Sequence, residues 1–212
     1  MKLLSLSTVI NYAFNYVARH SRIFNIDESH ALRHSMDVYK YANKIYESEV
    51  IKHPHLSAQQ EVIYMSAILH DMCDKKYMSE TIGMSMIKNY MTDYVSFKNL
   101  NIIEKIISTM SYSKVKTNGY PQLDKYQLAY HIVREADLLT SYDFERTIIY
   151  TMYNEHVDYE KALYISLELF EKRVFKYKHD NLFITDYSKE EALKLHYEAI
   201  ENIERLKNIL TL

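Results

Sequence analysis

Glycine and proline are nearly absent from this sequence, which has two of each among its 212 residues. Average usage would give roughly 15 glycines and 11 prolines. Tight turns between strands depend on these residues for their special backbone angles, so a β-sandwich, a barrel or a doubly wound α/β fold is disfavoured. Gly83 and Gly119 stand far apart in the chain, which excludes a glycine-rich phosphate-binding loop. The composition therefore predicts an all-α protein.

Disulfides, long apolar runs and an excess of one charge are also missing. Cys73 is the single cysteine, so no internal disulfide can form and a reducing, cytoplasmic location is expected. No apolar run approaches the ~20 residues of a membrane span. Residues 1–4 resemble the start of a signal peptide, but Ser5, Ser7 and Thr8 interrupt the apolar stretch. Lys plus Arg number 26 and Asp plus Glu 28, which predicts neither a nucleic-acid surface nor a polybasic membrane patch.

The hydrophobic pattern predicts one compact helical domain over residues 1–212, with no linker or internal repeat. Sequences that resemble capping boxes begin at Ser57 and Ser188 and are expected to open helices. About nine helices are expected, at residues 5–19, 29–48, 57–71, 79–91, 97–111, 123–139, 141–154, 158–177 and 188–210.

Polar side chains interrupt apolar helix faces at three places. His34 lies on the same predicted face as Val38 and Ile45 and should turn toward the core. The pair His70-Asp71 ends the most apolar helix, and Asp137 lies late in another. A buried carboxylate is costly unless it is paired or binds a metal. Two imidazoles and two carboxylates from three helices would suit a divalent ion.

Each of these signals is weak alone and has a simpler interpretation. His34 could be a core histidine with its hydrogen bonds satisfied, and Asp137 could pair with Arg134 three positions earlier. The His-Asp dipeptide alone is a weak signal, because the sequence has a second copy, His179-Asp180, in a polar, loop-like segment. We therefore expect the second copy to have no part in a metal site.

Four segments in order resemble the HD-domain superfamily of metal-dependent phosphohydrolases. Asp27–His34 (DESHALRH) is similar to the family's Ser-His-x-x-x-His motif, and Ile68–Lys76 (ILHDMCDKK) to the branch in which Asp-x-Lys follows the His-Asp pair. Ile107–Lys114 resembles a serine-rich segment between the second and last ligands, and Arg134–Leu139 resembles the final Asp motif. The resemblance covers roughly residues 27–146. It leaves residues 155–212 as C-terminal helices that pack on or cap this core.

The resemblance implies roles for the matching residues. His34, His70, Asp71 and Asp137 would be metal ligands. Asp74 would orient or deprotonate water, Lys76 would approach substrate phosphate, and His30 would lie near the metal. From charge alone, Lys114 and Arg146 are candidate phosphate contacts. For each of these last five residues a simple surface, loop or packing role is the competing interpretation, as a plain buried thiol is for Cys73.

The resemblance also implies one divalent ion rather than two, because members of the superfamily with two metals have further histidines between the His-Asp pair and the final Asp. Here His131 is the single histidine between Asp71 and Asp137, and it lies about 120° from Asp137 around its helix. Mn²⁺ is the first choice for assay, and Fe²⁺, Ni²⁺, Co²⁺ and Mg²⁺ also suit the ligand set. The resulting hypothesis is a phosphohydrolase acting on a small phosphorylated substrate, in particular a nucleotide. The alternatives are a catalytically silent HD domain that binds a nucleotide signal or a protein partner, and a helical regulatory domain with structural histidines. The oligomeric state is open, and a homodimer is compatible with the tyrosine-rich helix faces.

Overall fold

A computed structural model describes residues 5–209, with the side chain of Ile209 left out. Within this part of the chain there are helices and no strands, which confirms the predicted all-α class. The ten α-helices are α1 (Leu6–Ile23), α2 (Leu32–Lys52), α3 (Gln60–Leu69), α4 (Glu80–Met91), α5 (Phe97–Thr109), α6 (Tyr112–Asn118), α7 (Gln127–Thr140), α8 (Phe144–Glu155), α9 (Tyr159–Lys172) and α10 (Asp186–Ile209). Four short 3₁₀ helices join them: η1 (Pro54–Gln59), η2 (His70–Cys73), η3 (Asp124–Tyr126) and η4 (Val174–Lys176).

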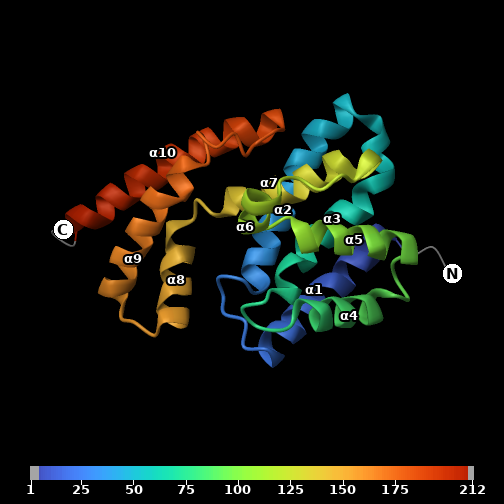
Figure 1. The fold of residues 1–212 in the computed structure, drawn as a ribbon, viewed down its shortest axis with the longest axis horizontal. Helices are drawn as coiled ribbons and strands as arrows, with labels where there is room; N and C mark the ends of the chain where they lie inside the picture. The colour runs from blue at the N-terminus through green and yellow to red at the C-terminus, as the bar shows by residue number, and fades with distance from the viewer. Residues whose placement is uncertain (1–4, 210–212) are drawn as a thin grey trace.

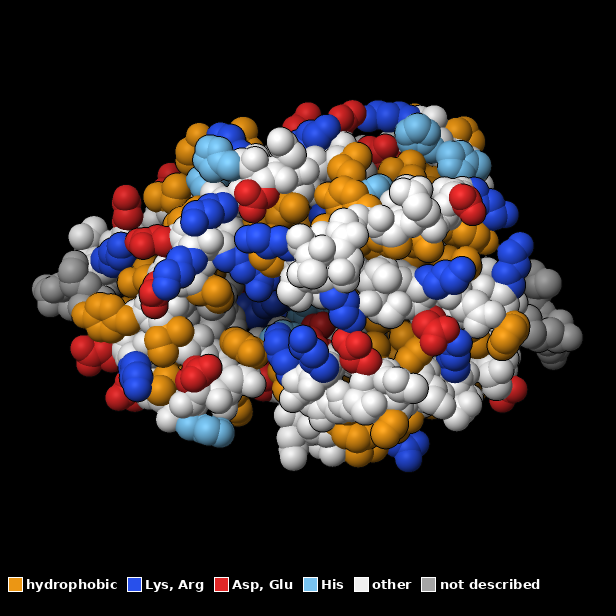
Figure 2. Space-filling view, in the orientation of Figure 1, with side chains coloured by type: hydrophobic (Ala, Val, Ile, Leu, Met, Phe, Trp, Pro, Cys, Tyr) orange, Lys and Arg blue, Asp and Glu red, His pale blue; other side chains and the backbone are white. Residues whose placement is uncertain are grey.

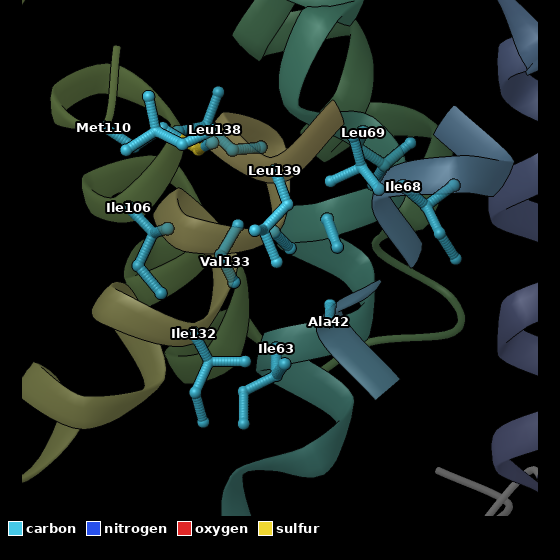
Figure 3. Close-up of a cluster of buried hydrophobic side chains, with 14 of the residues drawn as sticks. Ala42, Ile63, Ile68, Leu69, Ile106, Met110, Ile132, Val133, Leu138 and Leu139 are labelled. Atoms are coloured by element: carbon cyan, nitrogen blue, oxygen red, sulfur yellow. The ribbon is translucent and has the colours of Figure 1, made fainter. Parts of the chain in front are cut away.

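Helices α2, α3 and α7 pack against one another and form the centre of the molecule. Eight of the ten residues of α3 are buried, as its almost continuous apolar sequence predicts. Figure 3 shows side chains from these three helices and from α5 meeting in one cluster, including Ala42, Ile63, Ile106 and Ile132. Helices α2 and α7, and the turn η2 that follows α3, carry the polar residues that interrupt the apolar pattern.

The C-terminal helices α8, α9 and α10 lie to one side of the first seven helices (Figure 1). Helices α8 and α9 pack against each other, and α10 packs on α7 and α2. Glu135 on α7 anchors α10: its carboxylate accepts hydrogen bonds from the Ile184 amide at 2.8 Å and from the Thr185 amide and hydroxyl at 3.1 and 2.7 Å. Arg134, 2% exposed, pairs with Glu135 and donates to the Leu182 carbonyl.

Several helix ends differ from the predicted ones. Helix α2 begins at Leu32 and leaves His30 in a turn, because the Asp27 carboxylate accepts the Ser29 amide and hydroxyl and closes an Asx turn there. The capping box expected at Ser57 is wrong: Pro54 starts η1 three residues earlier, and the Ser57 hydroxyl donates to the Pro54 carbonyl.

The C-terminal half shows similar shifts. Ser188 does not open the last helix; α10 begins at Asp186, and the Thr185 hydroxyl accepts the Ser188 amide. The helix expected over 158–177 ends at Lys172 and continues as η4. Helix α6 was not expected and accounts for the tenth helix. Residues 1–4 and the expected end at Leu210 lie outside the described residues. No described helix is long and apolar enough to cross a membrane.

Candidate metal centre

Three central helices bring the predicted ligands together. His34 lies in the first turn of α2, Asp137 in the last turn of α7, and His70-Asp71 in η2, directly after α3. The 3₁₀ turn follows the apolar end of α3, so the two polar side chains emerge beside α2 and α7 rather than into the core. Packing of α2 against both α3 and α7 then places all four side chains at one point.

The donor atoms of the four side chains surround a space of the size of a metal ion. The Nε2 atoms of His34 and His70 are 3.1 Å apart. Asp71 Oδ2 lies 3.2 Å from His34 Nε2 and 3.3 Å from His70 Nε2. Asp137 Oδ1 lies 3.4 Å and 3.6 Å from the same two nitrogens. One ion at ~2.1 Å from each donor spans such separations, so His34, His70 and Asp137 form a group that could bind a metal ion.

The electrostatics of this group favour a bound cation. Burial alone would lower the pKa of His70, but the carboxylates of Asp71 and Asp137 outweigh it and hold that pKa well above its ordinary value. Burial would raise the pKa of Asp71 and Asp137, yet the neighbouring imidazoles hold both pKa values well below the usual range. Asp71 Oδ2 is buried and has no hydrogen-bond partner. A divalent ion fits this donor set of two nitrogens and two carboxylates.

The outer nitrogens of the two histidines have different partners. His70 Nδ1 lies 2.9 Å from the Ala67 carbonyl, an acceptor that keeps the hydrogen on Nδ1 and leaves the Nε2 lone pair for a ligand bond. His34 Nδ1 lies 2.5 Å from Nη1 of Arg146, which also donates to the Thr140 hydroxyl at 3.0 Å. Nη1 is also 3.3 Å from His34 Nε2, so the guanidinium lies against the imidazole ring and close to its ligating nitrogen.

A cleft opens from the ligand group in two directions. The larger part has a volume of about 390 Å³ and lies between η2, α4, α5 and α6. The smaller part, about 180 Å³, lies against α8 and the end of α9. Asp71 and Asp137 line both parts. Figure 2 shows a hollow near the centre of this face with Lys and Arg side chains gathered at it.

The remaining predicted residues line this cleft. Lys76 Nζ lies 3.1 Å from His30 Nε2 and 4.7 Å from the Tyr150 ring centroid. Asp74 Oδ1 accepts the Lys76 amide at 2.9 Å, while its Oδ2 is 3.9 Å from Lys76 Nζ. Arg146 lines the smaller part. Lys114 lines the larger part and is paired with Glu80 at 2.7 Å, so much of its charge is already neutralised.

The turn before α2 holds His30 in place through a network that the sequence pattern did not reveal. Asp27 accepts the Ser29 hydroxyl and the Tyr77 hydroxyl, the latter at 2.6 Å. Ser29 Oγ in turn lies 2.7 Å from His30 Nδ1. Burial is the main cause that lowers the pKa of His30, to about 3. His30 is thus a neutral imidazole whose Nε2 faces Lys76 and the cleft.

Arg173 is a further cation of the cleft, and no sequence motif indicated it. It lines both parts of the cleft, its guanidinium stacks on the Tyr112 ring at 4.4 Å, and its Nε donates to the Tyr177 hydroxyl at 2.8 Å. It comes from the end of α9, outside the segment that resembles the HD family. A lone arginine in a lysine-rich, solvated segment carries no sequence signal of its own, and only the packing of α9 brings it to the site.

The second His-Asp pair, His131 and Cys73 are not part of the ligand group. His179 and Asp180 are both exposed, in the turn after η4. His131 is buried on α7, where Gln127 contacts its Nε2 at 3.2 Å. Burial raises the pKa of the Cys73 thiol to about 12, with the charge of Asp71 adding to the effect. Cys73 is therefore a protonated thiol, and it does not belong to the group of side chains that could hold a metal ion.

Comparison with known proteins supports the fold of this chain and assigns it no family. No known family model matches the chain, and no curated protein matches it significantly. Among solved structures, the crystal structure of a Lactobacillus plantarum protein, a structural genomics target, is similar with a TM-score of 0.71. The likeness covers 96% of this chain and 97% of that one at 20% sequence identity. The chain therefore has the fold of a known natural protein.

Proposed function

We propose that this protein is a metal-dependent phosphohydrolase of the HD-domain type that cleaves a phosphate ester or anhydride bond of a nucleotide or similar small molecule. The observation that carries the proposal is the meeting of His34, His70, Asp71 and Asp137 at the floor of a cation-lined cleft. A divalent ion there would supply Lewis acidity and lower the pKa of a bound water.

The side chains around the ligand group have the properties that phosphoryl chemistry needs. Lys76, Arg146 and Arg173 line the smaller part of the cleft and can bind phosphate oxygens as charge develops on them. Asp74 Oδ2 is the atom that would take a proton from the attacking water, since Oδ1 is held by the Lys76 amide. The neutral His30 accepts a hydrogen bond from Lys76 and so fixes the position of that ammonium group.

The cleft also fits the proposed class of substrate. Its larger part, about 390 Å³, falls within the roughly 300–1,000 Å³ of small-molecule sites. The serine hydroxyls of Ser108, Ser111 and Ser113 line that part and suit a polar leaving group. The larger part is therefore the place for the leaving group, and the basic smaller part is the place for the phosphate.

The test is hydrolysis of nucleoside mono-, di- and triphosphates with Mn²⁺, Fe²⁺, Co²⁺, Ni²⁺ or Mg²⁺, in the wild type and in His70→Ala and Asp137→Ala. His179→Ala and Asp180→Ala are matched controls, because they remove the same groups from the exposed second His-Asp pair. We expect activity in the wild type and both controls, and loss of activity in the two site variants. Full activity in either site variant would refute the ligand assignment. Absence of hydrolysis, with nucleotide binding retained in EDTA, would instead support a catalytically silent domain.

A further inference from the structure

A separate cavity of about 240 Å³ lies between the turn after η4 and the helix α10. This volume has room for several water molecules or one small organic molecule. Its walls include the apolar side chains of Leu182, Phe183, Ala192 and Leu193. Tyr177 lines this cavity on one side and the smaller part of the metal-centre cleft on the other.

Two polar atoms at this cavity have no partner among the described residues. Tyr142 is 4% exposed, and its hydroxyl is buried without a hydrogen bond. His196 Nδ1 is likewise buried and unpartnered. Burial raises the pKa of Tyr142, so its hydroxyl remains a donor. A buried polar group without a hydrogen bond is unfavourable, so a ligand that reaches these atoms would gain by bonding to them.

The charge at the cavity has one sign. Lys178 and Lys189 are exposed at its rim, and none of the described residues that line it is acidic. Lys189 has a loose ion pair with Asp186 at 3.9 Å, which leaves its ammonium group able to bind an anion. We propose that this cavity is a second binding site, for a small organic anion whose apolar body fills the space beside Phe183 and whose anionic group binds Lys178 and Lys189.

The position of the cavity connects it to the proposed active site. A ligand in it contacts Tyr177, and the hydroxyl of Tyr177 holds the Nε of Arg173. Arg173 is the cation that the C-terminal helices contribute to the cleft. Occupation of the second site therefore restrains Tyr177 and, through it, the arginine that faces the substrate.

The experiment is a titration of the full-length protein with naphthalene-1-sulfonate, followed by ¹H–¹⁵N NMR. This probe has an apolar body and one anionic group, and it carries no phosphate bond, so the result is independent of the proposed hydrolysis. We expect shift changes at Tyr142, residues 177–183 and residues 189–196. Shift changes confined to the cleft around Arg146, or no binding, would overturn the proposal.

A pair of matched variants on α10 tests the assignment of the anionic group. Lys189→Glu reverses a charge at the rim, whereas Lys194→Glu makes the same change at an exposed position outside the cavity. Placing a like charge beside the anion should weaken binding by about tenfold or more in Lys189→Glu, and Lys194→Glu should bind as the wild type does. Equal binding by wild type and Lys189→Glu would refute the site, and both substitutions are on the surface, so folding is preserved.

Discussion

Arg146 is expected to oppose metal binding while it supports substrate binding, and the substitution Arg146→Met separates the two effects. Its Nη1 lies 3.3 Å from His34 Nε2. An ion about 2.1 Å beyond that nitrogen would be no more than about 5.4 Å from the guanidinium. A divalent ion and a unit charge at that distance repel by about 1.5 kcal/mol in a water-like medium and by about 6 kcal/mol at an effective dielectric constant of 20.

Two measurements on Arg146→Met follow from this. Isothermal titration with Mn²⁺ should give at least about tenfold tighter binding, the lower limit of the repulsion. The KM for the phosphorylated substrate should rise about tenfold to a hundredfold, since a hydrogen bond to a charged group contributes about 1.5–3 kcal/mol. Arg33→Met is the control, because Arg33 is exposed and paired with Asp37 at 2.8 Å on the same helix as His34. Weaker or unchanged Mn²⁺ binding in Arg146→Met would refute the reasoning.

Three further predictions concern stability. Glu135→Ala leaves Arg134 buried without its ion pair and should lower the free energy of unfolding by about 3–5 kcal/mol in urea, while the exposed control Glu201→Ala should stay within about 0.5 kcal/mol. Burial lowers the pKa of His131 to about 4, so the folded state keeps this imidazole neutral, while the unfolded state protonates it below a pKa of about 6.5. The free energy of unfolding should therefore decrease as the pH falls from about 6.5 toward 4. His131→Asn should flatten the dependence of Tm on pH across that range, and an unchanged slope would contradict this. Gly83→Ala places a Cβ 2.7 Å from Cys73 Cβ, and this overpacking should cost about 1–3 kcal/mol by thermal unfolding; a Tm equal to that of the wild type would show that the neighbouring chain yields freely.

The fold class and the candidate ligands could be predicted because they depend on local properties of the chain. The face shared by His34, Val38 and Ile45 follows from the 3.6-residue period alone, and the structure buries all three. The position of His70-Asp71 after the apolar residues of α3 is equally local. Helix ends were less predictable, because competing caps such as Thr185 and Pro54 lie close to the serines that matched the pattern.

Contacts between distant segments could not be predicted in the same way. Tyr77 reaches Asp27 across 50 positions, and Arg173 reaches the cleft from the end of α9. No sequence spacing or composition indicates either contact, since a tyrosine or an arginine at those positions could equally lie on a solvated helix face.

The sequence alone determined that this protein is helical, that it has no glycine-rich phosphate-binding loop, and that His34, His70, Asp71 and Asp137 were the candidate metal ligands. These follow from backbone preferences and periodicity, which act over a few residues. The tertiary structure alone decided that the Nε2 atoms of His34 and His70 lie 3.1 Å apart and 3.2–3.6 Å from the carboxylate oxygens of Asp71 and Asp137. It also decided that Arg146 faces His34 and that Arg173 completes the cleft. The physical reason is that packing of α2 against α3 and α7 sets these distances, and that packing is a property of the assembled core rather than of any one segment.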